Sequence, residues 1–212
     1  PLYQQIELPL CTVLYRMEKR GIAIDRKQLV QFGSMLSERI ADCESLIYGY
    51  ADGPFNINST RQLGQLLFEK LALPPVKKTK TGYSTNADVL EKLKDKHPII
   101  PAIMDYRMLT KLKSTYADGL LQEIREDGRI HTTFQNLVTA TGRLSSTDPN
   151  LQNIPVRTDL GAEIRKMFVP KNGCVLVDAD YSQIELRVLA HIADDKAMQE
   201  AFCSGADIHT AT

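Results

Sequence analysis

The spacing of apolar residues changes near residue 127, and this change constrains the fold more than any other feature of the sequence. Up to about Ile124, apolar side chains recur every three or four residues, the spacing that places them on one face of a helix. The longest stripe begins after Asp25 and continues to Ile47, and another runs from about residue 99 to residue 124. The first 126 residues therefore predict an all-helical region.

Start and stop signals divide this region into several helices. A first stripe precedes Gly21, a residue typical of helix C-termini, and consists of Ile6, Leu10, Val13, Leu14 and Met17. A short extended stretch, residues 21–24, follows it. Pairs of residues three apart predict later N-termini: Asp25 with Gln28, Ser59 with Gln62, and Thr85 with Asp88.

After residue 126 the pattern favours strands. Asp127-Gly128 is a turn signal, and residues 129–138 are rich in alternating and β-branched side chains. Residues 139–157 predict a long irregular connection, which in compact domains is usually functional or disordered. Residues 174–179 predict a buried strand, followed by a helix that Ser182 and Glu185 would cap. We therefore expect an α+β protein, with a helical domain over residues 1–126 and an α+β domain over residues 127–212.

Composition excludes several classes of protein. The chain has 212 residues, is 43% hydrophobic, and contains no apolar run long enough to span a bilayer. Its four cysteines form no Cys-x-x-Cys pair, which argues against a zinc site or a disulfide framework. We expect reduced thiols in a cytoplasmic protein with no membrane partner, the alternative being a redox role. The first residue is proline, so we expect the chain to be part of a longer protein.

The net charge is zero, but the charges are unevenly distributed. Residues 76–113 carry nine basic against four acidic side chains, and residues 178–200 carry six acidic against two basic ones. A basic segment suits phosphate binding and an acidic one suits metal binding. The alternative is that both segments are solvated helix faces.

Asp180 lies where the predicted strand ends and the helix begins, a place where ligands of α/β units tend to bind. Mg²⁺ takes oxygen ligands, commonly one or two carboxylates with waters and substrate phosphates. Asp178 would share the strand face with Asp180, so a pair is sterically conceivable. From spacing alone, a helix-cap or turn carboxylate is an equally good interpretation of Asp180.

Several long segments resemble the DNA polymerase I family (family A DNA-directed DNA polymerases). Residues 179–192, ADYSQIELRVLAHI, closely resemble its motif A. Residues 139–146 (TATGRLSS) and 148–155 (DPNLQNIP) resemble the palm segment along the primer-template minor groove, and residues 110–116 (TKLKSTY) resemble the thumb-to-palm stretch. The resemblance implies a helical thumb followed by the N-terminal part of the palm, ending where the fingers begin.

The resemblance also implies roles for residues near Asp180. Asp180 matches the first of two catalytic aspartates that hold two Mg²⁺ ions, and the Tyr181 carbonyl matches a second metal ligand. Glu185 matches the residue that disfavours a ribose 2′-hydroxyl, and Gln183 and His209 match positions near the incoming deoxynucleoside triphosphate. Asp178 is an additional carboxylate that the resemblance does not include.

Two further sets match DNA contacts. Phosphate contacts, which position a duplex without reading its sequence, match Arg107, Lys111, Lys113, Ser114 and Thr115. Contacts near the growing end match Arg143, Asn150, Gln152, Asn153 and Arg157. Amide and guanidinium groups there can reach minor-groove acceptors that every base pair presents, so contact can be independent of sequence.

Two other functions stay open. The fingers helix and the second aspartate motif are not in the sequence, so we expect the isolated chain to be inactive, and a DNA-binding module without chemistry is an alternative. A phosphoryl-hydrolysing nuclease would need further acids near Asp180, where only Asp178 and Glu185 are close in sequence. Neither the resemblance nor the composition requires an oligomer. The expected partners are primer-template DNA and deoxynucleoside triphosphates.

Overall fold

The computed structural model describes residues 1–79, 82–156 and 158–205. The chain divides into two compact units, Pro1–Gly173 and Cys174–Thr212, called here unit 1 and unit 2. Among the described residues, no helix combines the length and the apolar character that crossing a membrane requires.

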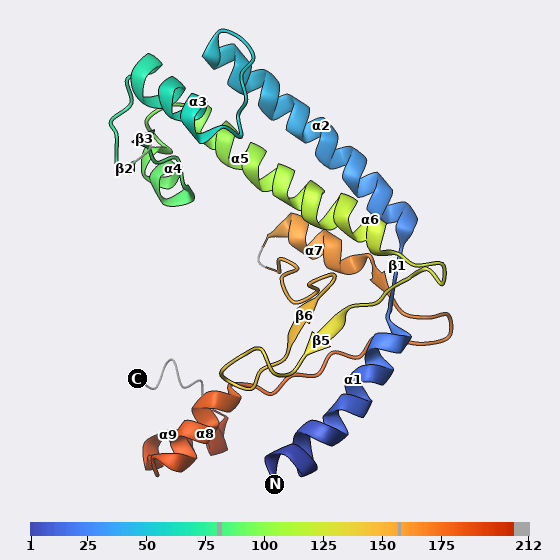
Figure 1. The fold of residues 1–212 in the computed structure, drawn as a ribbon. Coiled ribbons are helices and arrows are strands. Elements are labelled where there is room, and N and C mark those ends of the chain that lie inside the picture. The colour runs from blue at the N-terminus through green and yellow to red at the C-terminus, as the bar shows by residue number, and fades with distance from the viewer. Residues whose placement is uncertain (80–81, 157, 206–212) are drawn as a thin grey trace. The chain divides into compact units, whose positions relative to one another are not determined.

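Unit 1 is mainly helical (Figure 1). Its α-helices are α1 (Leu8–Arg20), α2 (Arg26–Ala51), α3 (Thr60–Gln65), α4 (Ala87–Leu93), α5 (Ile99–Leu112), α6 (Gly119–Glu123) and α7 (Asp159–Lys166). Three π-helical segments join or extend them, η1 (Tyr3–Glu7), η2 (Leu66–Lys70) and η3 (Lys113–Asp118). Its strands are β1 (Ile22–Ile24), β2 (Lys78–Thr79), β3 (Gly82–Tyr83), β4 (Arg129–Ile130), β5 (Thr133–Gln135), β6 (Ser145–Thr147) and β7 (Phe168–Val169).

The N-terminal helix has the predicted limits but little burial. α1 ends at Gly21, whose φ of 60° is the left-handed region that glycine adopts without strain. Of its apolar stripe only Leu14 is buried, whereas Ile6, Val13 and Met17 are about half exposed. The spacing of apolar residues therefore predicted the helix correctly, but it did not predict which of these side chains are buried.

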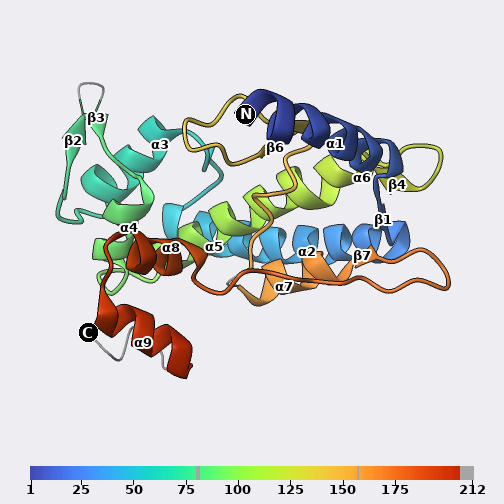
Figure 2. The ribbon, with the colours of Figure 1, turned by 90° about the horizontal axis from the view of Figure 1, so that it is seen from below.

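Helices α2 and α5 lie side by side and form the centre of unit 1 (Figures 1 and 2). The Asp25 carboxylate caps α2 by accepting a hydrogen bond from the Gln28 backbone N–H at 3.0 Å, as the sequence predicts. Both helices contribute to two apolar cores. One core includes Ile47 and Ile103 and also contains side chains of α3 and α4. The other includes Leu36 and Leu109 and also contains side chains of η3, α6 and α7.

Two other predicted caps differ from the structure. Asn86, not Thr85, caps α4, because its side chain accepts the Val89 N–H at 3.1 Å while Thr85 is buried. Ser59 caps α3 as predicted, accepting the Gln62 N–H at 3.4 Å. Any of the short polar residues before a helix can cap it, so spacing alone does not choose between neighbours.

A small sheet of order β4-β1-β7 joins distant parts of unit 1. The central strand β1 pairs antiparallel with both neighbours, Ile22 opposite Ile130 and Ala23 opposite Val169. The edge strand β4 thus pairs with a strand of the predicted helical domain. The predicted boundary at 126/127 is therefore not a break in the packing of this chain, and it stays a prediction about the domains of a longer protein.

The predictions for residues 129–157 are partly wrong. The strand character expected over residues 129–138 is present in two short strands, β4 and β5, and does not extend to residues 136–138. Part of the connection expected to be irregular is regular, because β6 pairs antiparallel with β5, with Phe134 opposite Ser146. The apolar pattern does not predict β6, because the strand consists of polar residues. Its central residue, Ser146, is buried, and its hydroxyl forms hydrogen bonds inside the fold.

Unit 2 contains α8 (Ile184–Ile192) and α9 (Lys196–Ser204) among its described residues. The predicted strand over residues 174–179 is absent, and its apolar side chains, including Val175 and Val177, are exposed. A strand needs a partner for its backbone hydrogen bonds, and no described segment pairs with this one. The predicted Ser182–Glu185 cap is also wrong, because Gln183 is the N-cap, with φ of 52° and no side-chain capping bond.

Candidate nucleic-acid interface

Three of the predicted phosphate ligands lie in one π-helical turn. Lys113, Ser114 and Thr115 belong to η3, which continues α5 without a break and leads into α6. Ser114 and Thr115 are exposed, and the Ser114 hydroxyl donates to the Lys111 carbonyl at 3.4 Å. π-Helical turns within α-helices occur frequently at functional sites.

Arg107 and Lys111 precede this turn on α5. Their spacing of four residues places both on one face of the helix, and Lys111 is exposed. The Arg107 guanidinium is half-buried and donates to the Thr85 carbonyl oxygen and, at 3.2 Å, to the Thr85 hydroxyl. Burial lowers the pKa of Arg107. A guanidinium has five N–H donors, so the Thr85 contacts leave others for a ligand.

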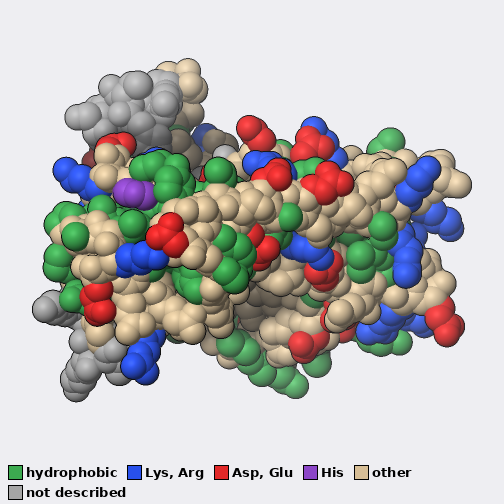
Figure 3. Space-filling model, turned by 90° about the horizontal axis from the view of Figure 1, so that it is seen from above, with side chains coloured by type: hydrophobic (Ala, Val, Ile, Leu, Met, Phe, Trp, Pro, Cys, Tyr) green, Lys and Arg blue, Asp and Glu red, His purple; other side chains and the backbone are tan. Residues whose placement is uncertain are grey.

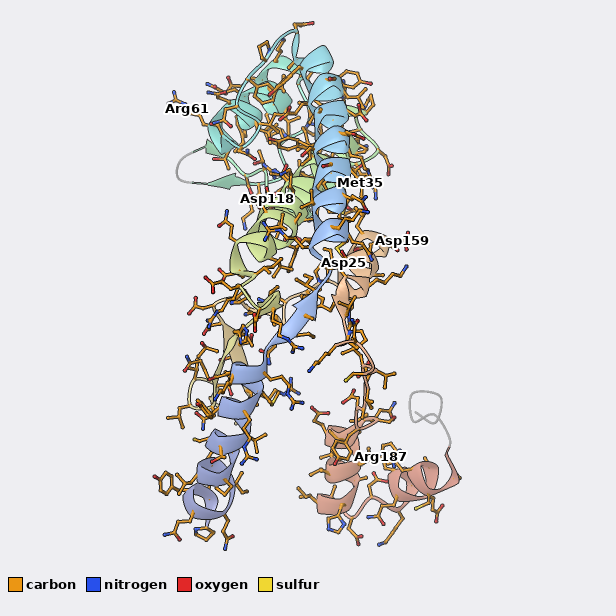
Figure 4. The ribbon with its side chains drawn as sticks, turned by 90° about the vertical axis from the view of Figure 1, so that its right-hand side faces the viewer. Asp25, Met35, Arg61, Asp118, Asp159 and Arg187 are labelled. Atoms are coloured by element: carbon orange, nitrogen blue, oxygen red, sulfur yellow. The ribbon has the colours of Figure 1, made fainter. Side chains whose placement is uncertain are left out.

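Arg107 lines a hollow of about 1050 Å³ in unit 1. Its wall also includes Arg61, Tyr83, Ser84 and Asn86. Arg61 comes from α3 and is exposed, as Figure 4 shows from the side. Two guanidinium groups with hydroxyl and amide donors can bind phosphate oxygens. The sequence does not indicate Arg61 or Ser84 as site residues, because only the folded chain brings α3 and the segment before α4 close to Arg107.

Lys113 forms a close ion pair with Asp118. The ammonium nitrogen lies 2.6 Å from Asp118 Oδ2 and 2.9 Å from Oδ1, so both carboxylate oxygens accept from it. The Lys113 side chain is 28% exposed and the Asp118 side chain 47%. Asp118 was not among the predicted site residues, and five-residue spacing would not have indicated a pair on an ordinary α-helix.

The turn η3 is joined to the loop that follows β6. The buried Tyr116 hydroxyl donates to the Asn153 carbonyl oxygen. Burial raises the pKa of Tyr116, so its hydroxyl keeps the proton that it donates. This bond brings the TKLKSTY and DPNLQNIP segments together, two of the segments that the sequence analysis singled out.

Buried hydroxyl groups fold the loop itself. The Thr132 hydroxyl lies 2.6 Å from that of Ser146 and donates to the Pro149 carbonyl at 2.8 Å. Ser146 also accepts the Leu151 N–H at 3.1 Å. Ser146 is almost fully buried, so these bonds satisfy polar groups that would otherwise destabilise the fold.

The amide residues of the loop are exposed, as a DNA contact requires. Asn150 accepts the Gln152 N–H at 2.9 Å, and the Gln152 side chain donates to the Leu144 carbonyl at 3.1 Å. Asn150, Gln152 and Asn153 are all exposed, and so is Arg143 in the preceding turn. Arg157, which was predicted with them, lies outside the described residues.

Basic side chains do not form a continuous patch on the face drawn in Figure 3. Lysines or arginines and acids are interspersed on the face drawn in Figure 3. Several pairs are close, including Lys70 with Asp52 at 3.0 Å and Lys94 with Glu91 at 3.4 Å. The basic excess of residues 76–113 is partly compensated by an acid outside this segment, because Lys113 pairs with Asp118 at 2.6 Å.

Unit 2 carries the predicted metal and nucleotide ligands. Asp180 and Tyr181 are exposed in the segment before α8, Gln183 is the N-cap, and Glu185 is exposed in the first turn. His209 lies outside the described residues. No group of three or more His, Cys, Asp or Glu that could hold a metal occurs in the part of the chain that the structure describes.

Arg187 holds the turn before α8. Its Nε–H donates to the Ser182 carbonyl at 2.9 Å, and its guanidinium carbon lies 4.6 Å from the centroid of the Phe202 ring on α9. The second contact is a cation–π geometry that joins α8 to α9. Arg187 is labelled in Figure 4 and was not among the predicted site residues.

Comparison with known proteins gives a consistent result. The family model of DNA polymerase family A matches residues 26–212. The chain is 58% identical to a DNA polymerase I of Caldicellulosiruptor bescii and 53% identical to that of Bacillus subtilis, over all of its length in both cases. It spans about a quarter of the length of these relatives, 25% and 24%.

The chain also resembles a solved structure. The POL domain of Pol1 from M. smegmatis, in complex with DNA primer-template and dNTP, superposes with a TM-score of 0.88 at 45% identity. The match covers 99% of this chain and 37% of the other. The α+β fold class predicted from the sequence is confirmed by this similarity. The chain belongs to DNA polymerase family A.

Proposed function

We propose that this chain is the part of a template-directed DNA polymerase that binds the primer-template duplex and supplies the first catalytic carboxylate. The observation that carries the proposal is the hydrogen bond from Tyr116 to Asn153. It joins a turn that carries predicted phosphate ligands to a loop that carries predicted minor-groove ligands. The DNA and dNTP bound by the M. smegmatis relative support the same partners here.

In this proposal, the residues of unit 1 bind DNA without reading its sequence. Arg107, Lys111 and Lys113 contact phosphates, with the Ser114 and Thr115 hydroxyls as further donors. Asn150, Gln152, Asn153, Arg143 and Arg157 contact the minor groove near the primer end. Their exposure leaves their amide and guanidinium groups accessible to such acceptors.

Asp180 and the Tyr181 carbonyl would hold Mg²⁺ in unit 2. Both are oxygen donors, the Asp180 side chain is exposed, and Mg²⁺ commonly takes only one or two carboxylates from the protein. The donor set therefore fits the ion, with remaining ligands from water, phosphates or residues outside the described ones. When bound, Mg²⁺ lowers the pKa of a coordinated hydroxyl and neutralises charge on phosphate oxygens.

The other residues of unit 2 would position the nucleotide. Glu185 would exclude a ribose 2′-hydroxyl, and Gln183 and His209 would contact the incoming nucleotide. The Arg187 bond to the Ser182 carbonyl would stabilise the turn between Asp180 and Gln183. A thumb over residues 1–126, a palm from residue 127 and a cytoplasmic role in replication or repair complete the proposal.

The test uses the longer protein that contains this chain. We expect Asp180→Asn to abolish primer extension while leaving primer-template binding nearly unchanged, because the amide cannot replace the carboxylate charge on Mg²⁺. Asp178→Asn is the matched control, since it removes a neighbouring carboxylate to which no role is assigned, and it should keep most of the activity. Equal activity of both variants, with intact DNA binding, would instead favour a DNA-binding module without chemistry.

A further inference from the structure

The ion pair between Lys113 and Asp118 depends on the π-helical turn. On an α-helix of 3.6 residues per turn, residues five apart point about 140° away from each other. A π-helix closes its backbone bonds between residues i and i+5 and so brings such residues onto one side. The segment η3 runs from Lys113 to Asp118 and therefore places these two side chains at hydrogen-bond distance.

The packing of η3 against α2 fixes the position of the carboxylate. Gly33 of α2 lies opposite this turn, and a Cβ there would be 3.5 Å from Ala117 Cβ and 3.9 Å from Asp118 Oδ1. Ala117 is fully buried. Figure 4 shows Asp118 beside α2. Asp118 is thus held by a buried neighbour and by a helix face, and its two oxygens face the Lys113 ammonium.

We propose that Asp118 restrains Lys113 and limits the affinity of this surface for nucleic-acid phosphates; this rests on the proposed DNA-binding function. An ammonium has three N–H donors, and Asp118 accepts from it with both oxygens. A phosphate that approaches Lys113 also meets the negative charge of Asp118. Lys113 therefore displaces fewer counterions from DNA than a lysine without such a partner.

Lys111 provides the comparison within the same surface. It is exposed, and among the described residues it has no ion pair. Lys113 is only 28% exposed and has its carboxylate at 2.6 Å. A duplex that must move along the protein after each addition benefits from phosphate contacts of limited strength. Asp118 sets that limit at Lys113.

The experiment measures duplex affinity against salt concentration for the longer protein and its variants. Asp118→Asn should raise the affinity and steepen the log–log slope by up to about 0.9, the value for one additional neutralised phosphate. The ratio of variant to wild-type affinity should then grow about threefold between roughly 200 and 50 mM salt. In the Lys113→Ala background, Asp118→Asn should have no such effect.

The matched control is Asp52→Asn, which removes the carboxylate of another lysine pair, that of Lys70 with Asp52 at 3.0 Å. It should change neither affinity nor slope. An Asp118→Asn protein with unchanged or lower affinity, or an increase that persists without Lys113, overturns the proposal. Thermal unfolding of each variant identifies any loss of affinity that comes from a damaged fold.

Failure of the underlying function would look different. If Lys111→Ala leaves affinity and slope unchanged, the surface is not a phosphate-binding surface, and the proposed function fails. If Lys111→Ala makes the slope shallower but Asp118→Asn has no effect, only the role of Asp118 is wrong.

Discussion

The Tyr116 hydroxyl donates a hydrogen bond to the Asn153 carbonyl, 37 residues later in the chain. Tyr116 is buried against α2 and α5 residues, whereas Asn153 is exposed. A buried side chain of the helical core thus holds the backbone of an exposed loop. Both stability and DNA binding should depend on this bond.

We expect Tyr116→Phe to lower the free energy of unfolding by about 1 kcal/mol, the net contribution of a typical hydrogen bond. Affinity for primer-template DNA should fall because the loop loses its anchor, while the salt slope stays the same because no phosphate ligand is removed. Tyr106→Phe is the control, since that buried hydroxyl lies at 3.4 Å from Asn58 Nδ2 and should matter less. Equal effects of both variants would show that the Asn153 contact has no special role.

Lys111→Ala should weaken DNA binding on all sequences alike. Loss of one phosphate contact should make the log–log salt slope shallower by about 0.9. Lys70→Ala, which removes a lysine already paired with Asp52, is the control and should leave the slope unchanged. Titrations with several duplex sequences at a series of salt concentrations measure both quantities, and a change confined to one sequence would contradict the phosphate assignment.

Gly21 and Gly49 should respond in opposite directions to alanine. At Gly21, with φ of 60°, an added Cβ would lie 2.7 Å from the Ile130 carbonyl oxygen, so we expect destabilisation by more than about 1 kcal/mol. At Gly49, inside α2, a Cβ meets nothing within 4 Å, so alanine should stabilise by about 0.5–1 kcal/mol. Denaturant unfolding of both variants checks the pair, and a stabilising Gly21→Ala would contradict the described geometry.

The stability of unit 1 should fall in acid partly through Asp127. Burial alone would raise the pKa of Asp127, but hydrogen bonds from the His131 ring, at 2.9 Å, and the Arg129 N–H, together with their charges, lower it. A carboxyl group whose pKa is lowered by folding stabilises the fold at pH values above its ordinary pKa. This stabilisation is lost as the pH falls through the lowered pKa.

We therefore expect the difference in stability between wild type and Asp127→Asn to shrink below pH ~4, as the Asp127 carboxylate becomes protonated. Thermal unfolding from pH 7 down to pH ~3 measures this difference. A difference that does not change across the range would show that the Asp127–His131 contact contributes nothing through ionisation.

In the longer protein, Glu185→Ala should raise the use of ribonucleotides relative to deoxyribonucleotides, because it opens space for the 2′-hydroxyl. Glu200→Ala, which removes another exposed acid of unit 2, is the control and should leave the ratio unchanged. The ratio of the two kcat/KM values measures selectivity. An unchanged ratio for Glu185→Ala, with normal deoxynucleotide addition, would remove Glu185 from the nucleotide site.

The sequence predicted features that local chemistry determines. The Asp25 cap of α2 and the stop of α1 at Gly21 are confirmed, because each depends on residues within one turn. The strand over residues 174–179 was wrong, since a strand exists only with a partner and apolar composition does not supply one. The cap at Thr85 was wrong because Arg107, 22 residues later, binds that side chain.

The candidate site was predictable in part for the same reason. Motif resemblance indicated candidate site residues, but not that Tyr116 joins two of the motifs or that Asp118 forms an ion pair with Lys113. The first contact is distant in sequence, and the second requires a π-helical turn that no simple periodicity predicts.

The order of strands β4-β1-β7 has a consequence for synthesis of the protein. Ala23 pairs with Arg129 on one side and with Val169 on the other, so β1 is fully paired only when both neighbouring strands have formed. On the ribosome, α2 and α5 can pack once residue 112 has emerged, whereas β1 gains its last partner only after residue 169. Closing such long loops is slow. One edge of β1 therefore stays unpaired in the nascent chain until β7 has been synthesised. Substitutions that slow the pairing of β7 with β1 should increase aggregation during translation more than they change the stability of the finished fold.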